Sequence, residues 1–126
     1  MHSQQITWNA RAGWTSVKAQ PETVSLVFYF GTREMLASGA RYNELRQMFP
    51  LAHILGCSTG GQINNHDVSD DEIVAAAIGF DSTRLRLVHQ DIADAQQSCS
   101  CGEAIGRALS QEDLAGVFVL SDGIPR

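Results

Sequence analysis

The sequence predicts an α/β domain with a mixed, largely parallel sheet that contains a βαβ unit and a hairpin, with helices packed on its faces. Residues 24–30 form a nearly continuous apolar run, which is typical of a strand covered on both faces. Residues 33–49 carry apolar side chains at helical spacing, and a second apolar run follows at residues 52–55. A strand, a helix and a strand within about 30 residues indicate a βαβ unit.

The helical segment has recognisable ends. Tyr42, Leu45 and Phe49 form its apolar stripe, and Gly39 weakens the helix only slightly. Thr32 is a suitable N-cap, and Pro50 cannot continue the helix. We therefore expect one helix over residues 33–49.

The remaining elements follow from apolar runs and turn residues. We expect strands at residues 73–80 and 85–88, joined as a hairpin through residues 81–83, after a turn-rich loop at 64–71. Ser100 and Glu103 have the spacing of a capping box, which predicts a helix start. Residues 117–120 read as a final buried strand.

The two ends of the sequence suggest the domain organisation. Residues 1–22 are polar without sustained periodicity, so we interpret them as an N-terminal arm that Trp8 and Trp14 pin to a domain formed by residues 23–126. A buried strand at residues 117–120 needs neighbours that the following residues do not supply. The chain is therefore expected to be an incomplete part of a larger fold, or to be covered by a partner chain.

Composition narrows the class of partner. A length of 126 residues suits one domain, and a net charge of −5 with nine scattered basic residues argues against nucleic acid and anionic membranes. The most apolar stretch is far shorter than the ~20 residues of a membrane span, and no signal peptide is visible. Three cysteines are more consistent with reduced thiols in a cytoplasm than with a disulfide framework.

Two glycine-bearing loops follow predicted strands and are the candidate ligand site. Open α/β sheets bind ligands beyond the carboxyl ends of their strands. Glycines there allow unusual backbone angles and close approach to a ligand, and hydroxyl and carboxylate groups suit a small polar molecule. The candidate ligand-binding residues are Gly56, Cys57, Ser58, Thr59, Gly60, Gly61, Ser121, Asp122 and Gly123.

Enzymatic and metal-binding interpretations have weaker support. Residues 56–60 match the G-x-S-x-G elbow of α/β hydrolases, but that elbow needs a helix directly after the serine. Asp81 and His89 have the order of triad partners for Ser58 without a link to it, and Cys57 has no evident base. Cys99 and Cys101 lack a second ligand pair, so no metal site is expected. We expect no catalytic residues.

One family shares this pattern. The helix ending in Phe49-Pro50, the segment Gly56-Cys-Ser-Thr-Gly-Gly-Gln-Ile63 and the later Leu120-Ser-Asp-Gly-Ile124 resemble the N-terminal region of FIST domains, over about residues 20–126. Members of that family continue well beyond the Ser-Asp-Gly segment.

The resemblance implies a sensory domain of bacterial signal transduction that binds a small ligand, with amino acids the usual proposal. It also implies an output partner such as a histidine kinase or a cyclic-dinucleotide enzyme. Haem for nitric oxide sensing is the alternative that the resemblance leaves open, with His2, His53, His66 or His89 as axial ligand. A purely structural interaction domain and a homo-oligomer also remain open.

Overall fold

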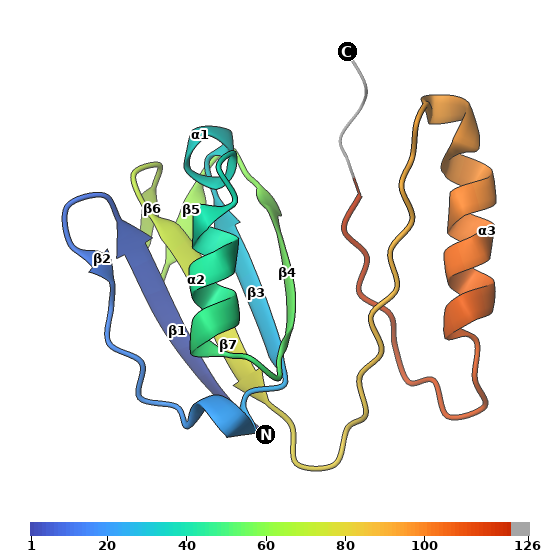
Figure 1. Ribbon diagram of the computed structural model, residues 1–126, viewed down its shortest axis with the longest axis horizontal. Helices are drawn as coiled ribbons and strands as arrows, with labels where there is room; N and C mark the ends of the chain where they lie inside the picture. The colour runs from blue at the N-terminus through green and yellow to red at the C-terminus, as the bar shows by residue number, and fades with distance from the viewer. Residues whose placement is uncertain (122–126) are drawn as a thin grey trace. The chain divides into compact units, whose positions relative to one another are not determined.

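The computed structural model describes residues 1–121, and the chain divides into two compact units, Met1–Arg84 and Leu85–Arg126. The first unit is an α/β domain, as the sequence predicted (Figure 1). Its elements are β1 (His2–Asn9), β2 (Gly13–Trp14), the 3-10 turn η1 (Pro21–Thr23), β3 (Leu26–Gly31), α1 (Arg33–Leu36), α2 (Ala40–Met48), β4 (His53–Ser58), β5 (Gln62–Asn64), β6 (Asp67–Ser69) and β7 (Ile73–Gly79).

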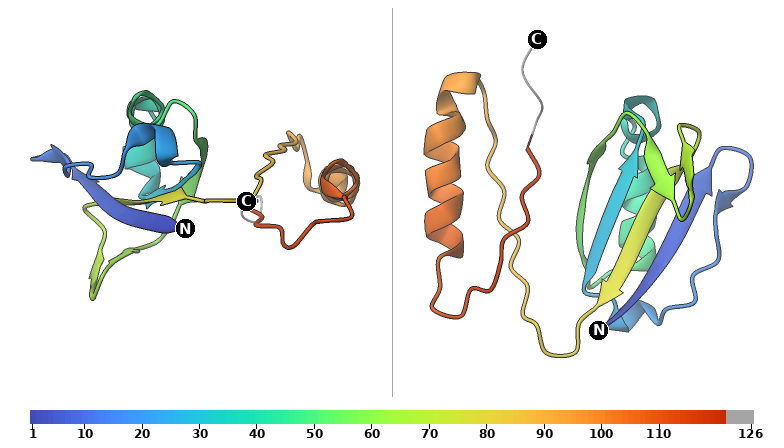
Figure 2. Two further views of the ribbon diagram at one scale, coloured as in Figure 1. Left: turned by 90° about the horizontal axis from the view of Figure 1, so that it is seen from below. Right: turned by 180° about the vertical axis from the view of Figure 1, so that it is seen from behind.

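The main sheet of the first unit is mixed. Its strand order is β2-β1-β7-β3-β4, and the helices α1 and α2 cover one face of it (Figure 2). Strands β3 and β4 pair in parallel, whereas β7 is antiparallel to both of its neighbours. Parallel pairing in the described residues is therefore confined to β3 and β4, which is less than the largely parallel sheet that we expected.

The predicted βαβ unit is present as β3, the two helices and β4. Thr32 is the N-cap, because its hydroxyl accepts a hydrogen bond from the backbone N–H of Met35. The expected single helix is instead two, since Gly39 adopts a left-handed conformation with φ of 71° and starts α2 anew. The turn after α2 is held by the Arg46 guanidinium, which donates to the carbonyl of Ala52 at 2.7 Å.

Strand β1 was missed by the sequence analysis, which interpreted residues 1–22 as an arm. The strand pairs with β7 over seven positions from His2↔Gly79 to Trp8↔Ile73. Its inward residue Ile6 is 1% exposed, and its other face carries Ser3, Gln5 and Thr7. The polar outer face hid the strand, because only alternate residues need to be apolar when one face is open to water.

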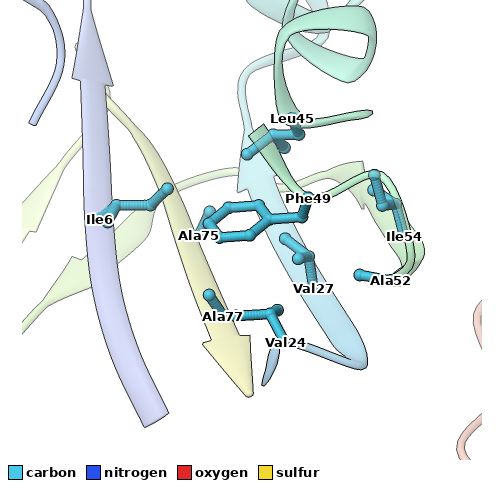
Figure 3. Packing of buried hydrophobic residues seen from close by; sticks show 9 residues of the cluster. All are labelled: Ile6, Val24, Val27, Leu45, Phe49, Ala52, Ile54, Ala75 and Ala77. Carbon is cyan, nitrogen blue, oxygen red and sulfur yellow. The ribbon is translucent and has the colours of Figure 1, made fainter. Parts of the chain in front are cut away.

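The core lies between the sheet and α2. Phe49, at the end of α2, is fully buried among Val27 of β3, Leu45 of α2 and the alanines of β7 (Figure 3). Small side chains at Ala75 and Ala77 let the helix approach the central strand, and the large ring of Phe49 fills the space above them. Buried and half-buried residues alternate along β7, as expected for a strand with one face packed against a helix.

The segment between β4 and β7 is a short second sheet rather than the loop that we expected at residues 64–71. Strands β5 and β6 pair antiparallel, and Asn65 in the turn between them has a positive φ of 56°. Asparagine tolerates this conformation better than most residues, so a two-residue turn forms here. The side chains of Ile63 and Val68 form an exposed cross-strand pair on this hairpin.

The second unit contains η2 (Ala95–Gln97) and α3 (Ser98–Leu109). The helix starts at Ser98, so the expected capping box at Ser100 and Glu103 lies inside it, where Glu103 pairs with Arg107 instead. Residues 85–88 and 117–120 form no strand, which contradicts both the predicted hairpin and the predicted final buried strand. Apolar runs favour strands only when another strand can pair with their backbone groups.

Candidate functional site

One rim of the main sheet brings together segments that are distant in sequence. The carboxyl ends of β3 and β4 meet there, and the backbone N–H of Thr59 donates to the carbonyl of Gly31 at 2.9 Å. Because β7 runs antiparallel to β3, it begins at this rim, and β1 ends there beside it. Figure 1 shows α1 and the β5–β6 hairpin at the same end of the sheet. The rim is the place where an open α/β sheet is expected to bind a ligand.

The glycine-rich segment runs from β4 into this rim. Gly56, Cys57 and Ser58 belong to β4, and the residues that follow lead into β5. Only Gly13 and Gly39 among the glycines of residues 1–121 have positive φ. Gly56, Gly60 and Gly61 therefore do not use the left-handed backbone region that a glycine allows.

Gly56 is required for a different reason. A Cβ at this position would lie 2.3 Å from the ring of Tyr29 and 2.5 Å from its carbonyl oxygen. Gly60, by contrast, has nothing within 4 Å of such an atom. The glycine at position 56 makes room for the partly buried Tyr29 side chain, whereas Gly60 lies in open space.

Ser58 is exposed at the end of β4, and Cys57 is a half-buried free thiol. The segment after Ser58 continues into strand β5 and not into a helix, so the hydrolase elbow does not form. Asp81 forms an ion pair with the N-terminal ammonium group. That ammonium is the first cause of the lowered pKa of the Asp81 carboxyl.

The second predicted loop is only partly described. Ser121 is exposed in the second unit, and Asp122 and Gly123 lie outside the described residues. The convergence of residues 56–61 with residues 121–123 therefore stays a prediction.

An open hollow lies on the same rim within the first unit. Its volume is about 580 Å³, and its walls come from the β1–β2 turn, helix α1 and the connection from β6 to β7. The lining residues are Asn9, Ala10, Arg11, Met35, Ser69, Asp71 and Glu72. A volume of this size falls in the range of small-molecule sites. None of these residues was predicted from the sequence as a site residue, because they come from three separate segments.

The hollow carries both signs of charge. Arg11 and Asp71 are exposed, whereas Glu72 is half-buried and accepts a hydrogen bond from the Asn64 side chain at 3.0 Å. The side-chain oxygen Oδ1 of Asn9 accepts a hydrogen bond from the backbone N–H of Arg11 and fixes the β1–β2 turn. A guanidinium and two carboxylates around one hollow can pair with a ligand that has both an anionic and a cationic group.

The turn that carries Arg11 is attached to α2 by aromatic side chains. The Arg41 guanidinium lies 4.2 Å from the centre of the Trp8 ring, and Arg41 pairs with Glu44 at 2.6 Å. The Trp14 indole N–H donates to the Glu44 carboxylate at 2.6 Å. Trp8 and Trp14 therefore act as the packing anchors that the sequence predicted.

Gln62 supports the opposite wall. Its side chain is 2% exposed, and its amide is assigned with Oε1 accepting from the Thr59 hydroxyl at 2.8 Å, because the opposite assignment would turn Oε1 toward the carbonyl oxygens of Ser69 and Glu72. In this orientation Nε2 donates to the carbonyls of Ser69 at 2.8 Å and Glu72 at 3.0 Å. The glycine-rich segment thus contacts the wall of the hollow through Gln62.

Within residues 1–121 no three His, Cys, Asp or Glu side chains gather as metal ligands. The same stretch has no helix with the length and apolar character needed to cross a bilayer.

The sequence model of one family, the FIST N domain, matches residues 25–125. The chain belongs to the FIST N domain family. The family resemblance stated from the sequence is therefore correct, and no curated protein or solved structure matches the chain. FIST domains are sensory domains of signal transduction. In this FIST N domain the matched region begins just before β3, so it includes the glycine-rich segment and two walls of the hollow, whereas Arg11 precedes it.

Proposed function

We propose that this FIST N domain binds a small polar metabolite, such as an amino acid, in the rim hollow. The observation that carries the proposal is that the guanidinium-bearing Arg11 and the carboxylate-bearing Asp71 and Glu72 all line one hollow at the strand-end rim. An α-amino acid has a carboxylate for the guanidinium and an ammonium group for the carboxylates. Two oppositely charged contacts also fix the orientation of a small ligand.

The test is a calorimetric titration of the native protein with amino acids, organic cations, organic anions and hemin. We expect binding of one zwitterionic class. Arg11→Gln and Asp71→Asn should each weaken it about tenfold or more, since each removes one charge-assisted contact. The charge-matched controls are Lys18→Gln and Glu22→Gln, which are exposed and outside the hollow. Equal loss in the controls, or full affinity in Arg11→Gln and Asp71→Asn, would contradict the proposal.

The same titration separates the hollow from the site predicted by the sequence. Ser58→Ala and Asp122→Ala remove two side chains that the sequence predicted as ligand contacts, and Ser58 is not a lining residue of the hollow. Affinity lost only in these two variants would place the ligand on the glycine-rich loops instead. A Soret band with hemin that one histidine substitution removes would favour the haem alternative.

The proposal assigns no catalytic step to this domain. The domain would signal ligand binding to a partner protein. The proposed partner is a histidine kinase or a cyclic-dinucleotide enzyme. The absence of a helix after Ser58 supports a binding role over a hydrolase. Covalent labelling of Ser58 or Cys57 by a fluorophosphonate would argue for the enzyme instead.

A further inference from the structure

Gln62 in β5 is a buried polar side chain outside the hydrophobic core cluster. It is 2% exposed, and each of its polar contacts is to another segment of the rim. Asn, Gln and charged residues are seldom buried unless they are hydrogen-bonded, because an unpaired amide in the interior costs free energy. A side chain of this kind at the base of a hairpin therefore calls for a role that an apolar residue could not fill.

The contacts of Gln62 define that role. Its Nε2 donates to the carbonyls of Ser69 and Glu72, which flank the two-residue segment that contains Asp71. Its Oε1 accepts from the Thr59 hydroxyl in the glycine-rich segment. A primary amide is the only neutral side-chain group that can donate two hydrogen bonds from one atom and accept on the other.

The alternatives at this position would fail in different ways. A methionine has nearly the same shape but would leave two carbonyls and one hydroxyl without their partner. A glutamate would bring a second oxygen against the two carbonyls, and it could donate one hydrogen bond only after it is protonated.

We infer that Gln62 is a positioning residue that holds the acidic wall of the hollow and links it to the glycine-rich segment through Thr59. The Thr59 hydroxyl then acts on the site through Gln62, although the sequence predicted Thr59 as a direct ligand contact. The importance of this wall for binding rests on the proposed function, but the geometric role of Gln62 can be tested without a ligand.

The test uses backbone amide NMR shifts of Asp71 and Glu72 in the ligand-free protein. Gln62→Met should move both resonances and should accelerate exchange of the Asp71 amide about tenfold, while Ala75 and Ala77 in β7 stay unchanged. Asp70, Asp71 and Glu72 carry carboxyls of their own, so each variant is compared with the native protein at the same pH. In Gln62→Glu the difference from the native shifts should shrink as the pH falls and the introduced carboxyl gains its proton, whereas in Gln62→Met the difference should not depend on pH. Gln47→Glu on the exposed side of α2 is the matched control.

Thr59→Val tests the link. It should shift Asp71 and Glu72 in the same direction as Gln62→Met but by less, and it should add nothing in a Gln62→Met background. Native shifts in Gln62→Met, or additive effects of the two substitutions, would overturn the inference. If Gln62→Met fails to fold, the acid-dependent recovery of Gln62→Glu and the Thr59→Val shifts decide the matter. Failure of amino acids to bind would count against the proposed function alone.

Discussion

At the scale of single residues, the glycines of residues 56–61 differ in their surroundings. Gly56 lies against the partly buried Tyr29, whereas a side chain at Gly60 would meet no atom within 4 Å. Sequence alone could not separate them, because both belong to one glycine-rich motif and the difference arises from a neighbouring strand. The motif could be located from the sequence, but the reason for each glycine needed the register of β3 against β4.

Gly56→Ala should therefore destabilise the domain, by about 2 kcal/mol, through overpacking against Tyr29. Movement of the Tyr29 ring would relieve only part of the clash, because the Tyr29 backbone carbonyl oxygen also lies 2.5 Å from the new Cβ. Gly60→Ala is the control and should change the free energy of unfolding by less than about 0.5 kcal/mol. Urea unfolding of both variants checks this, and equal stabilities would contradict the packing of Tyr29.

Tyr29 also predicts a pH dependence. Burial raises the pKa of its phenol, with smaller contributions from Tyr42 and Cys57. Because the folded protein holds this proton more tightly than the unfolded chain, the contribution to stability is complete below the unfolded pKa of 10.0 and is lost as the pH rises through the folded value. Tyr29→Phe should weaken the loss of stability above that pH, as measured by urea unfolding across the alkaline range. An unchanged slope would show that Tyr29 ionises freely.

At the scale of elements, the sequence located helices better than it located their interruptions. The apolar stripe and the cap at Thr32 are local signals, and the cap was correct, as was the stripe at Leu45 and Phe49. The third residue of the predicted stripe, Tyr42, is exposed instead. Gly39 was predicted only to weaken one continuous helix slightly, whereas it interrupts that helix. A glycine inside a helical pattern does not reveal the sign of its φ. The second sheet of β5 and β6 was missed because its strands are three residues each.

Two glycines in helical regions should respond in opposite ways to alanine. Gly39→Ala should destabilise the first unit by about 1 kcal/mol, because a Cβ is disfavoured at a φ of 71°. Gly102→Ala, at a site in α3 with no atom within 4 Å, should stabilise that helix by roughly 0.5–1 kcal/mol. Thermal unfolding followed by far-UV circular dichroism gives both signs, and a stabilised Gly39→Ala variant would rule out the left-handed turn.

At the scale of the whole molecule, local patterns predicted the α/β class, the βαβ unit and the FIST family. They could not predict the hollow, because its walls come from residues about 60 positions apart along the chain that β1–β7 pairing brings together. They predicted strands in the second unit that do not form. An apolar run indicates that its side chains favour burial, but it does not indicate which backbone will pair with it. Strand partners are a property of the complete sheet.

The strand order of that sheet also has a consequence for synthesis. β7 is the last strand of the first unit along the chain, yet it lies between β1 and β3, which do not pair with each other. A nascent chain that ends before Ile73 thus holds three fragments whose strands do not pair with one another, a β1–β2 hairpin, a βαβ unit and the β5–β6 hairpin. Protease resistance should appear abruptly once β7 has left the ribosome, so nested chains ending at residues 72 and 84 should differ sharply in lifetime during limited digestion. The ribosome would release a domain whose central strand arrives last.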